Sequence, residues 1–464
     1  MAIYNLDKTK TYDTNGRILN NYIHNNLTTV NNITIRDNGF GTIENMCNLF
    51  SNLNNVININ LVNMNTSKVT NIIDMFYNCH NLMNISNFNT NNVTNMYEMF
   101  YYCNHLTTVP NFNTINVTNM FNMFLYCHNL INVPNFNTSN VTSMKSMFEG
   151  CTNLINVSNF NTINVIDMRS IFEGCHNLTN IPNFNTNNVK DMRFMFEYCY
   201  NLTTVPNFNT NNVTSMSGMF SRCYNLTTVP NFNTNNVTNM YEMFHHCSSL
   251  TTVPNFNTNN VTNMYEMFSG CYNLINIPNF NTSKVTSMYF MFGMGSSASF
   301  VNHNFNFLTE IPNFDTSNVT NMSSMFSGGL NITTIPNFNT SKVTNMSNMF
   351  HSCDNLKIVP KFDMSNVTNT SNMFYTCRAL VNVPEFNLIN VINATNMFYL
   401  YWSGTFNTIN LTQSSINNIV ASCANAINVT NKSFANIGIF NTILRGYIQN
   451  APRYSAAVAN GWVL

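Results

Sequence analysis

The residues of this chain best suited to metal or nucleophile chemistry are its thirteen cysteines and nine histidines. Three of the cysteines are followed directly by histidine, at Cys79-His80, Cys127-His128 and Cys175-His176. Such pairs would suit zinc only with further ligands at zinc-site spacing, and no two cysteines form a C-x-x-C pair. The position after cysteine is also Asn104, Thr152, Tyr200, Tyr224 and Tyr272 in other repeats. We therefore expect no metal at these pairs, and free, buried cysteines.

Catalytic arrangements cannot be assembled either. No Ser-His-Asp, paired-carboxylate or phosphate-loop pattern occurs, and the 18 acidic residues are scattered along the chain. Methionine pairs such as Met96 with Met99 and Met240 with Met243 stand at helical spacing, which favours a core role over copper binding. The sequence predicts neither an enzyme nor a cofactor.

The cysteines and phenylalanines recur with a fixed 24-residue period. Phe76, Phe100 and Phe124 keep this step onward to Phe292, and the interval to the next phenylalanine of the series, Phe326, is longer because of an insertion. One unit reads C-x-N-L-T-x-V-P-N-F-N-T-x-N-V-T-N-M-x-x-M-F-x-x. A unit this short cannot bury its own apolar side, so stacked units must share one core.

The two halves of the unit predict different local structures. One half has apolar residues at the spacing of an amphipathic helix, namely Val213, Met216, Met219, Phe220 and Cys223. Thr210 or Asn211 would be its N-cap. Residues 201–208 are β-prone and contain a proline, which suits a brief strand and a turn. We predict an α/β repeat solenoid: a leucine-rich-repeat-like, right-handed stack of about fourteen strand-plus-short-helix units, with N- and C-terminal caps.

Three segments follow from this pattern. Residues 1–45 are predicted to be an N-terminal cap or attachment segment, and residues 46–401 the solenoid. An insertion at residues 293–307 is either a binding loop or a tolerated bulge. Residues 402–464 differ in composition, and their helix-spaced apolar residues predict a helical C-terminal cap. The predicted structural core includes Phe76, Phe100, Cys103, Met216, Met219, Phe220 and Cys223.

The unit F-x-x-C-x-x-L-x-x-[VI]-P, followed by N-F-[ND]-T-[SN]-x-V-T-[NS]-M-x-x-M-F, resembles the BspA-like leucine-rich repeat of bacterial surface proteins. Clear copies stand at residues 244–254 and 313–326, and the resemblance covers roughly residues 46–401. It implies a leucine-rich-repeat solenoid that acts in surface recognition or adhesion. Similar arrays occur in proteins encoded by bacteriophages, and residues 456–462 resemble the closing segment of some of these.

Comparing the repeats with one another separates the inside from the outside. Positions beside the Met-x-x-Met-Phe box vary, so we expect them to face solvent, and many of them are aromatic. Exposed rings on a nearly uncharged scaffold suit stacking on sugars or anchoring a protein, whereas the alternative is that they only cover the edges of neighbouring turns. The candidate ligand-binding residues are Tyr77, Tyr97, Tyr101, Tyr102, Phe121, Tyr126, Tyr224, Tyr241, Tyr265, Tyr272 and Tyr289.

Charged pairs replace the aromatic residues in three consecutive repeats. They are Lys145 with Glu149, Arg169 with Glu173, and Arg193 with Glu197. Each pair has i, i+4 spacing, so on the predicted helices the three pairs would form a ladder that stabilises the array slightly.

The composition narrows the choice of partner. Net charge is zero and charged residues make up 8% of the chain, which argues against nucleic acid. No apolar stretch is long enough for membrane insertion, and no signal-peptide pattern precedes the repeats. We predict a non-catalytic recognition protein of a phage virion (tail fibre, spike or head decoration) that binds a host surface glycan or protein and contacts other virion proteins through residues 1–45. A bacterial cell-surface adhesin and an intracellular interaction scaffold are the alternatives.

Overall fold

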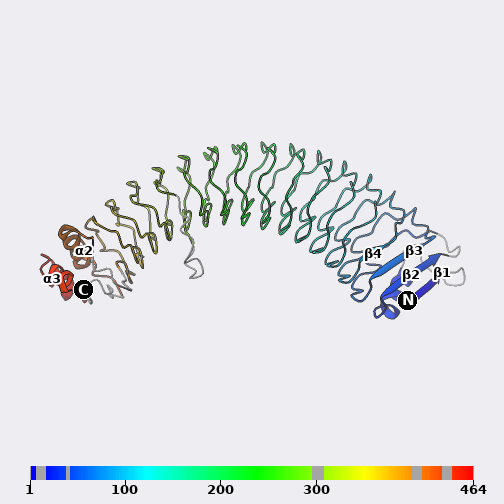
Figure 1. The fold of residues 1–464 in the computed structure, drawn as a ribbon, viewed down its shortest axis with the longest axis horizontal. Coiled ribbons are helices and arrows are strands. Elements are labelled where there is room, and N and C mark those ends of the chain that lie inside the picture. The colour runs from blue at the N-terminus through cyan, green and yellow to red at the C-terminus, as the bar shows by residue number, and fades with distance from the viewer. Residues whose placement is uncertain are drawn as a thin grey trace. The chain divides into compact units, whose positions relative to one another are not determined.

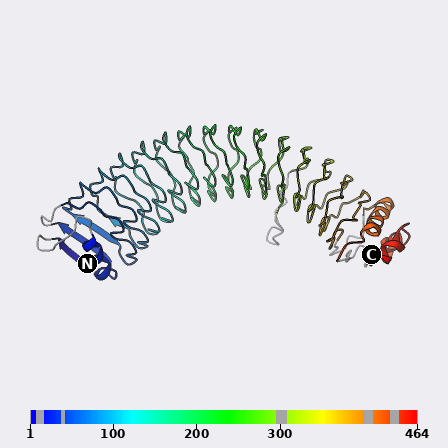
Figure 2. The same cartoon turned by 180° about the vertical axis from the view of Figure 1, so that it is seen from behind.

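Successive coils of the chain follow the 24-residue period and stack on one another (Figures 1 and 2). The computed structural model describes residues 2–6, 17–37, 42–294, 308–399, 410–430 and 442–462. These residues belong to two compact units, Met1–Asn236 and Val237–Leu464. The predicted solenoid is confirmed, whereas nearly all of the predicted insertion at residues 293–307 lies outside the described residues. The three segment boundaries remain predictions.

The first unit begins with regular secondary structure. Strands β1 (Ala2–Leu6), β2 (Asn32–Asp37), β3 (Asn58–Val62) and β4 (Asn84–Ile85) form a parallel sheet in the order β1-β2-β3-β4, and helix α1 (Arg17–Asn26) connects the first two strands (Figure 1). Ile33 pairs with Ile59, which pairs with Ile85. Beyond β4 the parallel pairing continues as single bridges, such as that between Asn156 and Asn180.

The predicted helices of the repeats are wrong. The described coils contain consecutive turns in place of a helix, including the segment from Val213 to Cys223. In most of the described coils two residues have a left-handed backbone conformation, as Glu98 (φ 51°) and Tyr102 (φ 57°) show. Such residues interrupt the i to i−4 hydrogen bonds of a helix and redirect the N–H groups.

The redirected N–H groups bind the next coil. The backbone N–H of Glu98 donates to the carbonyl of Phe121 (3.1 Å), and the N–H of Phe100 donates to the carbonyl of Met123 (2.9 Å). The N–H groups between them close tight turns, as Met99 does onto Met96. The predicted strand at residues 201–208 is also absent, and Pro206 in this stretch has no N–H to donate to a ladder.

Stacked phenylalanine rings fill the centre of the coils. Phe76, Phe100 and Phe124 lie 5.2 and 5.4 Å apart between ring centroids, with planes within 3° of parallel. The thiol of Cys103 donates to the carbonyl of Phe76 at 3.1 Å, which joins one coil to the previous one. Every residue of the predicted core is fully buried: Phe76, Phe100, Cys103, Met216, Met219, Phe220 and Cys223.

The abundant asparagines and threonines satisfy the backbone groups that the coils leave unpaired. Thr210, which the sequence suggested as a helix N-cap, is buried, and its hydroxyl donates to the Asn233 carbonyl of the next coil (2.7 Å). On the surface, the amide of Asn212 donates to the carbonyl of Asn187 in the previous coil (2.7 Å). Both contacts recur along the array, so the polar composition is largely a set of bonds between coils.

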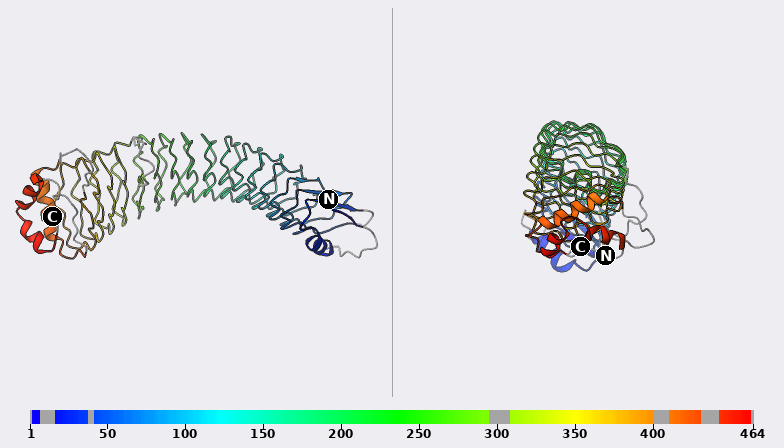
Figure 3. Two further views of the ribbon diagram at one scale, coloured as in Figure 1. Left: turned by 60° about the horizontal axis from the view of Figure 1, so that its bottom comes forward. Right: turned by 90° about the vertical axis from the view of Figure 1, so that its left-hand side faces the viewer.

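Helices flank the coils at both ends. In the first unit, the ring of His24 on α1 lies 2.9 Å from the carbonyl of Ser51 in an early coil. In the second unit, Ser415 on helix α2 accepts from the N–H of Val383 at 3.0 Å. Helices α2 (Gln413–Asn425), α3 (Thr442–Gln449) and α4 (Tyr454–Ala459) lie in the segment for which the sequence predicted a helical cap (Figure 3). None of the described helices has the length and apolar character needed to span a bilayer.

Replacing Phe220 by Ala tests the phenylalanine core. The ring is fully buried and stacks on Phe196 with centroids 5.7 Å apart. We expect the free energy of unfolding, measured by urea denaturation, to fall by about 3–5 kcal/mol because a cavity remains. Ile131→Thr is the control, because Ile131 is 44% exposed and Thr107 holds the same position in the preceding repeat. Equal midpoints for the two variants would contradict the proposed core.

The cysteines give a second test of burial. All thirteen are free, and only Cys47 among them is half-buried while the others are buried. Burial raises the pKa of the Cys79 thiol to about 12 and that of Cys103 well above its ordinary value. We expect a thiol reagent such as dithionitrobenzoate to modify at most Cys47 in the native protein and all the cysteines in denaturant. Rapid modification of several native thiols would refute this picture.

Candidate functional site

The variable surface of each unit is built by four positions of every Met-x-x-Met-Phe box. They are the two residues between the methionines and the two residues after the phenylalanine, and we call their surface the box face. In one coil these residues are Tyr97, Glu98, Tyr101 and Tyr102, all half-buried. Because the coils stack in register, a side chain on the box face lies beside its equivalents one repeat before and one repeat after it.

The early aromatic residues of the first unit form one cluster on the box face. Tyr77 stacks on Tyr101 with centroids 4.9 Å apart, and Tyr102 lies 4.8 Å from Tyr126. The hydroxyl of Tyr126 donates to Glu149 at 3.3 Å. Ring contacts therefore join four of the predicted residues, Tyr77, Tyr101, Tyr102 and Tyr126, and pair Tyr97 with Phe121 on the same box face.

A second cluster lies on the box face of the second unit. Tyr241, Tyr265 and Tyr289 occupy the same position of successive boxes, with centroids 5.1 and 4.7 Å apart. Tyr272 stands outside the box, directly after its cysteine, and its ring lies 6.4 Å from that of His246.

Tyr224 of the first unit occupies the position after cysteine as well. Its ring lies 5.0 Å from that of Tyr200, which stacks in turn on His176 at 4.3 Å. Tyr224 is 39% exposed. Sequence reasoning had treated Tyr200 and His176 only as evidence against a metal site, although the repeat period alone would have placed them beside Tyr224.

Three tyrosines of the box face have raised pKa values. A hydrogen bond to Glu98, together with burial, raises the pKa of Tyr97 to about 12. Burial, followed by the charge of Glu149, raises the pKa of Tyr126 to about 12. The pKa of Tyr241 is raised mainly by burial and then by its hydrogen bond to Glu242. The rings therefore present neutral hydroxyl groups.

The predicted ladder of charged pairs is wrong. The helical i, i+4 geometry that the ladder required is absent, and the ion pairs of the two arginines are with aspartates instead of the glutamates after each box. Arg169 binds Asp167 at 2.6 Å and lies 3.4 Å from Asp191, which also binds Arg193 at 2.7 Å. Lys145 lies over the ring of Phe121, with its Nζ 4.8 Å from the ring centroid. The predicted pairs were Lys145 with Glu149, Arg169 with Glu173, and Arg193 with Glu197.

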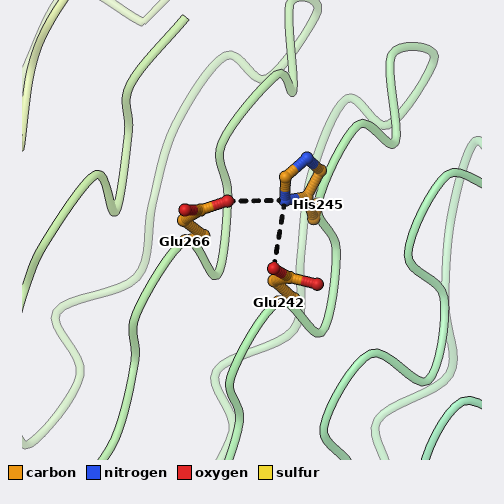
Figure 4. Close-up of side chains that lie close together, drawn as sticks. All are labelled: Glu242, His245 and Glu266. Carbon is orange, nitrogen blue, oxygen red and sulfur yellow. Dashed lines mark ion pairs between the residues drawn. The ribbon is translucent and has the colours of Figure 1, made fainter. Parts of the chain in front are cut away.

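Two glutamates and a histidine meet on the box face of the second unit (Figure 4). The Nδ1 atom of His245 lies 2.9 Å from Oε2 of Glu266 and 3.9 Å from Oε1 of Glu242. Among the described residues they are the one group of three or more potential metal-ligating side chains close enough to share an ion. Sequence reasoning missed this cluster, although the repeat period relates the two glutamates and the (i, i+3) spacing ties His245 to Glu242.

The Cys-His pairs that first suggested metal chemistry have separate environments. The thiol of Cys127 donates to the buried carbonyl of Phe100 at 3.0 Å, whereas the ring of His128 lies 2.9 Å from the carbonyl of Gly150. The two side chains of such a pair therefore contact different partners.

Comparison with known proteins finds one matching family model. The family model described as "Mycoplasma protein of unknown function, DUF285" matches residues 20–132, 126–227, 200–300 and 296–411. A search of curated proteins finds no significant match.

Similar solved structures include two bacterial leucine-rich repeat proteins. That from T. pallidum is 18% identical, with 44% of this chain and 86% of that chain covered and a TM-score of 0.23. That from Eubacterium ventriosum is 13% identical, with 83% and 87% covered and a TM-score of 0.32. Because these scores are low, the architecture described above rests on the chain's own geometry. The four family matches together extend from residue 20 to residue 411, and the chain therefore belongs to the family described as Mycoplasma protein of unknown function, DUF285.

Proposed function

We propose that this chain is a non-catalytic recognition protein whose box face binds a protein partner in adhesion. The observation that carries the proposal is the row of contacting aromatic rings at one position of successive boxes, with centroids 5.1 and 4.7 Å apart at Tyr241, Tyr265 and Tyr289. Rings held by a rigid array lose little freedom on binding, and tyrosine is enriched among residues that dominate binding energy.

The chemistry of the described residues supports a binding role over catalysis. Burial raises the pKa of thiols such as Cys103 and Cys127 well above the ordinary value, which suppresses the reactive thiolate. The raised pKa values of Tyr97, Tyr126 and Tyr241 keep these three hydroxyls protonated at neutral pH. Arg169 and Arg193 are held by aspartates.

The packing of the rings favours a protein over a sugar. Tyr77 and Tyr101 are within 7° of parallel with centroids 4.9 Å apart, so each covers one face of the other. Stacking on a sugar requires an open ring face, which an internal member of such a ladder lacks. Edges and hydroxyls suit the mixed apolar and hydrogen-bonding surface of a protein.

The proposal also includes where the protein acts. The resemblance to BspA-like repeats concerns bacterial surface proteins, and the family description concerns mycoplasmas. Both favour attachment at a bacterial cell surface over the phage virion that the sequence first suggested.

Fractionation of the native source tests this location. We expect quantitative mass spectrometry to find the protein enriched in washed cell envelopes relative to cytosol and purified virus particles. Enrichment in particles at a fixed ratio to the capsid protein would place it in a virion instead, and enrichment in cytosol would favour an intracellular scaffold.

Replacing both Tyr241 and Tyr265 by Ser tests the aromatic surface. Serine holds the same position at Ser217 and Ser323, so the coils should keep their fold. We expect at least a tenfold loss in the binding of the fluorescently labelled full chain to washed target cells, with an unchanged circular dichroism spectrum.

Ile275→Thr is the matched control for the tyrosine variant. Ile275 is 54% exposed outside the box face, and Thr251 holds the same position one repeat earlier. Protease treatment of the cells should abolish binding, whereas periodate, which oxidises sugars, should leave it intact. Full binding by the tyrosine variant and by an equivalent Tyr77, Tyr101 variant would refute the aromatic surface.

A further inference from the structure

Glu242, His245 and Glu266 come from two adjacent boxes and point toward one another (Figure 4). Glu242 and Glu266 hold the second position between the methionines, and both have a left-handed backbone, with φ of 52° and 53°. His245 follows the phenylalanine of the first box. One nitrogen and two carboxylate oxygens thus lie within 4.8 Å of one another.

The cluster is short of positive charge for its degree of burial. The side chains of Glu242 and Glu266 are only 19% and 15% exposed. In the part of the chain that the structure describes, the ion pairs of these two carboxylates are with His245 alone, and no lysine or arginine joins them. Oxygens of the two carboxylates lie within 4.8 Å of each other. Two partly buried carboxylates this close repel each other unless a cation lies between them.

The histidine nitrogen gives an independent indication of a ligand. His245 is only 9% exposed, and its Nδ1 atom is buried without a hydrogen-bond partner. The 2.9 Å contact with Glu266 is therefore not directed as a hydrogen bond. A buried nitrogen left without a hydrogen-bond partner is unfavourable, and a bound ion would supply that partner.

We propose that Nδ1 of His245 and one oxygen each of Glu242 and Glu266 bind a divalent transition-metal ion of the zinc class. Zinc binds histidine nitrogen and carboxylate oxygen at about 2.0–2.2 Å, so ligands around a tetrahedral ion lie about 3.3 Å apart. The observed separations of 2.9 and 3.9 Å from Nδ1 bracket this value. Three protein ligands leave one position of the ion for water or for a group of a partner.

The ligand set distinguishes zinc from the hard cations. Calcium takes six to eight oxygen ligands, and magnesium requires octahedral oxygen coordination, so neither uses an imidazole nitrogen. A second pair of carboxylates at the same positions lacks the histidine. Asp74 and Glu98 hold the same position as the two glutamates, but Tyr77 stands where His245 would be.

Zinc titration of the untagged, chelator-treated, reduced full chain tests the proposal by isothermal calorimetry. We expect one ion per chain and a rise in melting temperature on addition of zinc. His245→Ser removes one of three ligands and should weaken binding at least tenfold. Serine is compatible with the coil, because Ser221 and Ser269 hold the same position.

His351→Ser is the matched control. His351 occupies the position of His245 in another box, but Asn348 and Asn372 stand where Glu242 and Glu266 would be. This variant should bind zinc like the unaltered chain. Absence of binding, equal affinity in His245→Ser, or tighter binding of magnesium or calcium than of zinc would overturn the proposal. Because the assay contains only the ion, its result does not depend on the proposed recognition role.

Discussion

The alternation of right- and left-handed residues in each Met-x-x-Met-Phe box is the constraint on which the rest of the structure depends. A left-handed residue other than glycine costs about 1–2 kcal/mol, and such residues recur at equivalent positions, as Glu98, Glu242 and Asn348 show. In return, every second N–H points out of its own coil and binds a carbonyl of the next one. Without this alternation, the same apolar residues would be free to form helices.

Stacking in register turns each position of the repeat into a column of like residues. In the core this produces the parallel phenylalanine rings, and between coils it produces repeated threonine and asparagine hydrogen bonds. Few of these bonds need charge, which accounts for a stable array with only 8% charged residues. The columns of the box face are free to vary because the backbone, and not their side chains, holds the coils together.

The two proposed activities use this freedom in different ways. Aromatic residues repeated in one column produce a row of contacting rings, which we propose binds a protein. Carboxylates repeated in the next column produce a close, partly buried pair, and one histidine turns that pair into a mixed ligand set. Both sites arise from neighbours one repeat apart, and neither requires a loop outside the repeats.

The sequence by itself determined the period, the buried residues and the variable positions, because comparing repeats reveals which side chains share one environment. It could not determine the backbone. Apolar spacing at Val213, Met216 and Phe220 fits a helix, yet any backbone that turns these residues inward gives the same pattern. Only the tertiary structure decided which side chains meet across coils, so it replaced the predicted i, i+4 pairs with Arg169–Asp167 and brought His245 to Glu266. These contacts depend on the conformation of each turn and the register of the next coil, neither of which local propensity encodes.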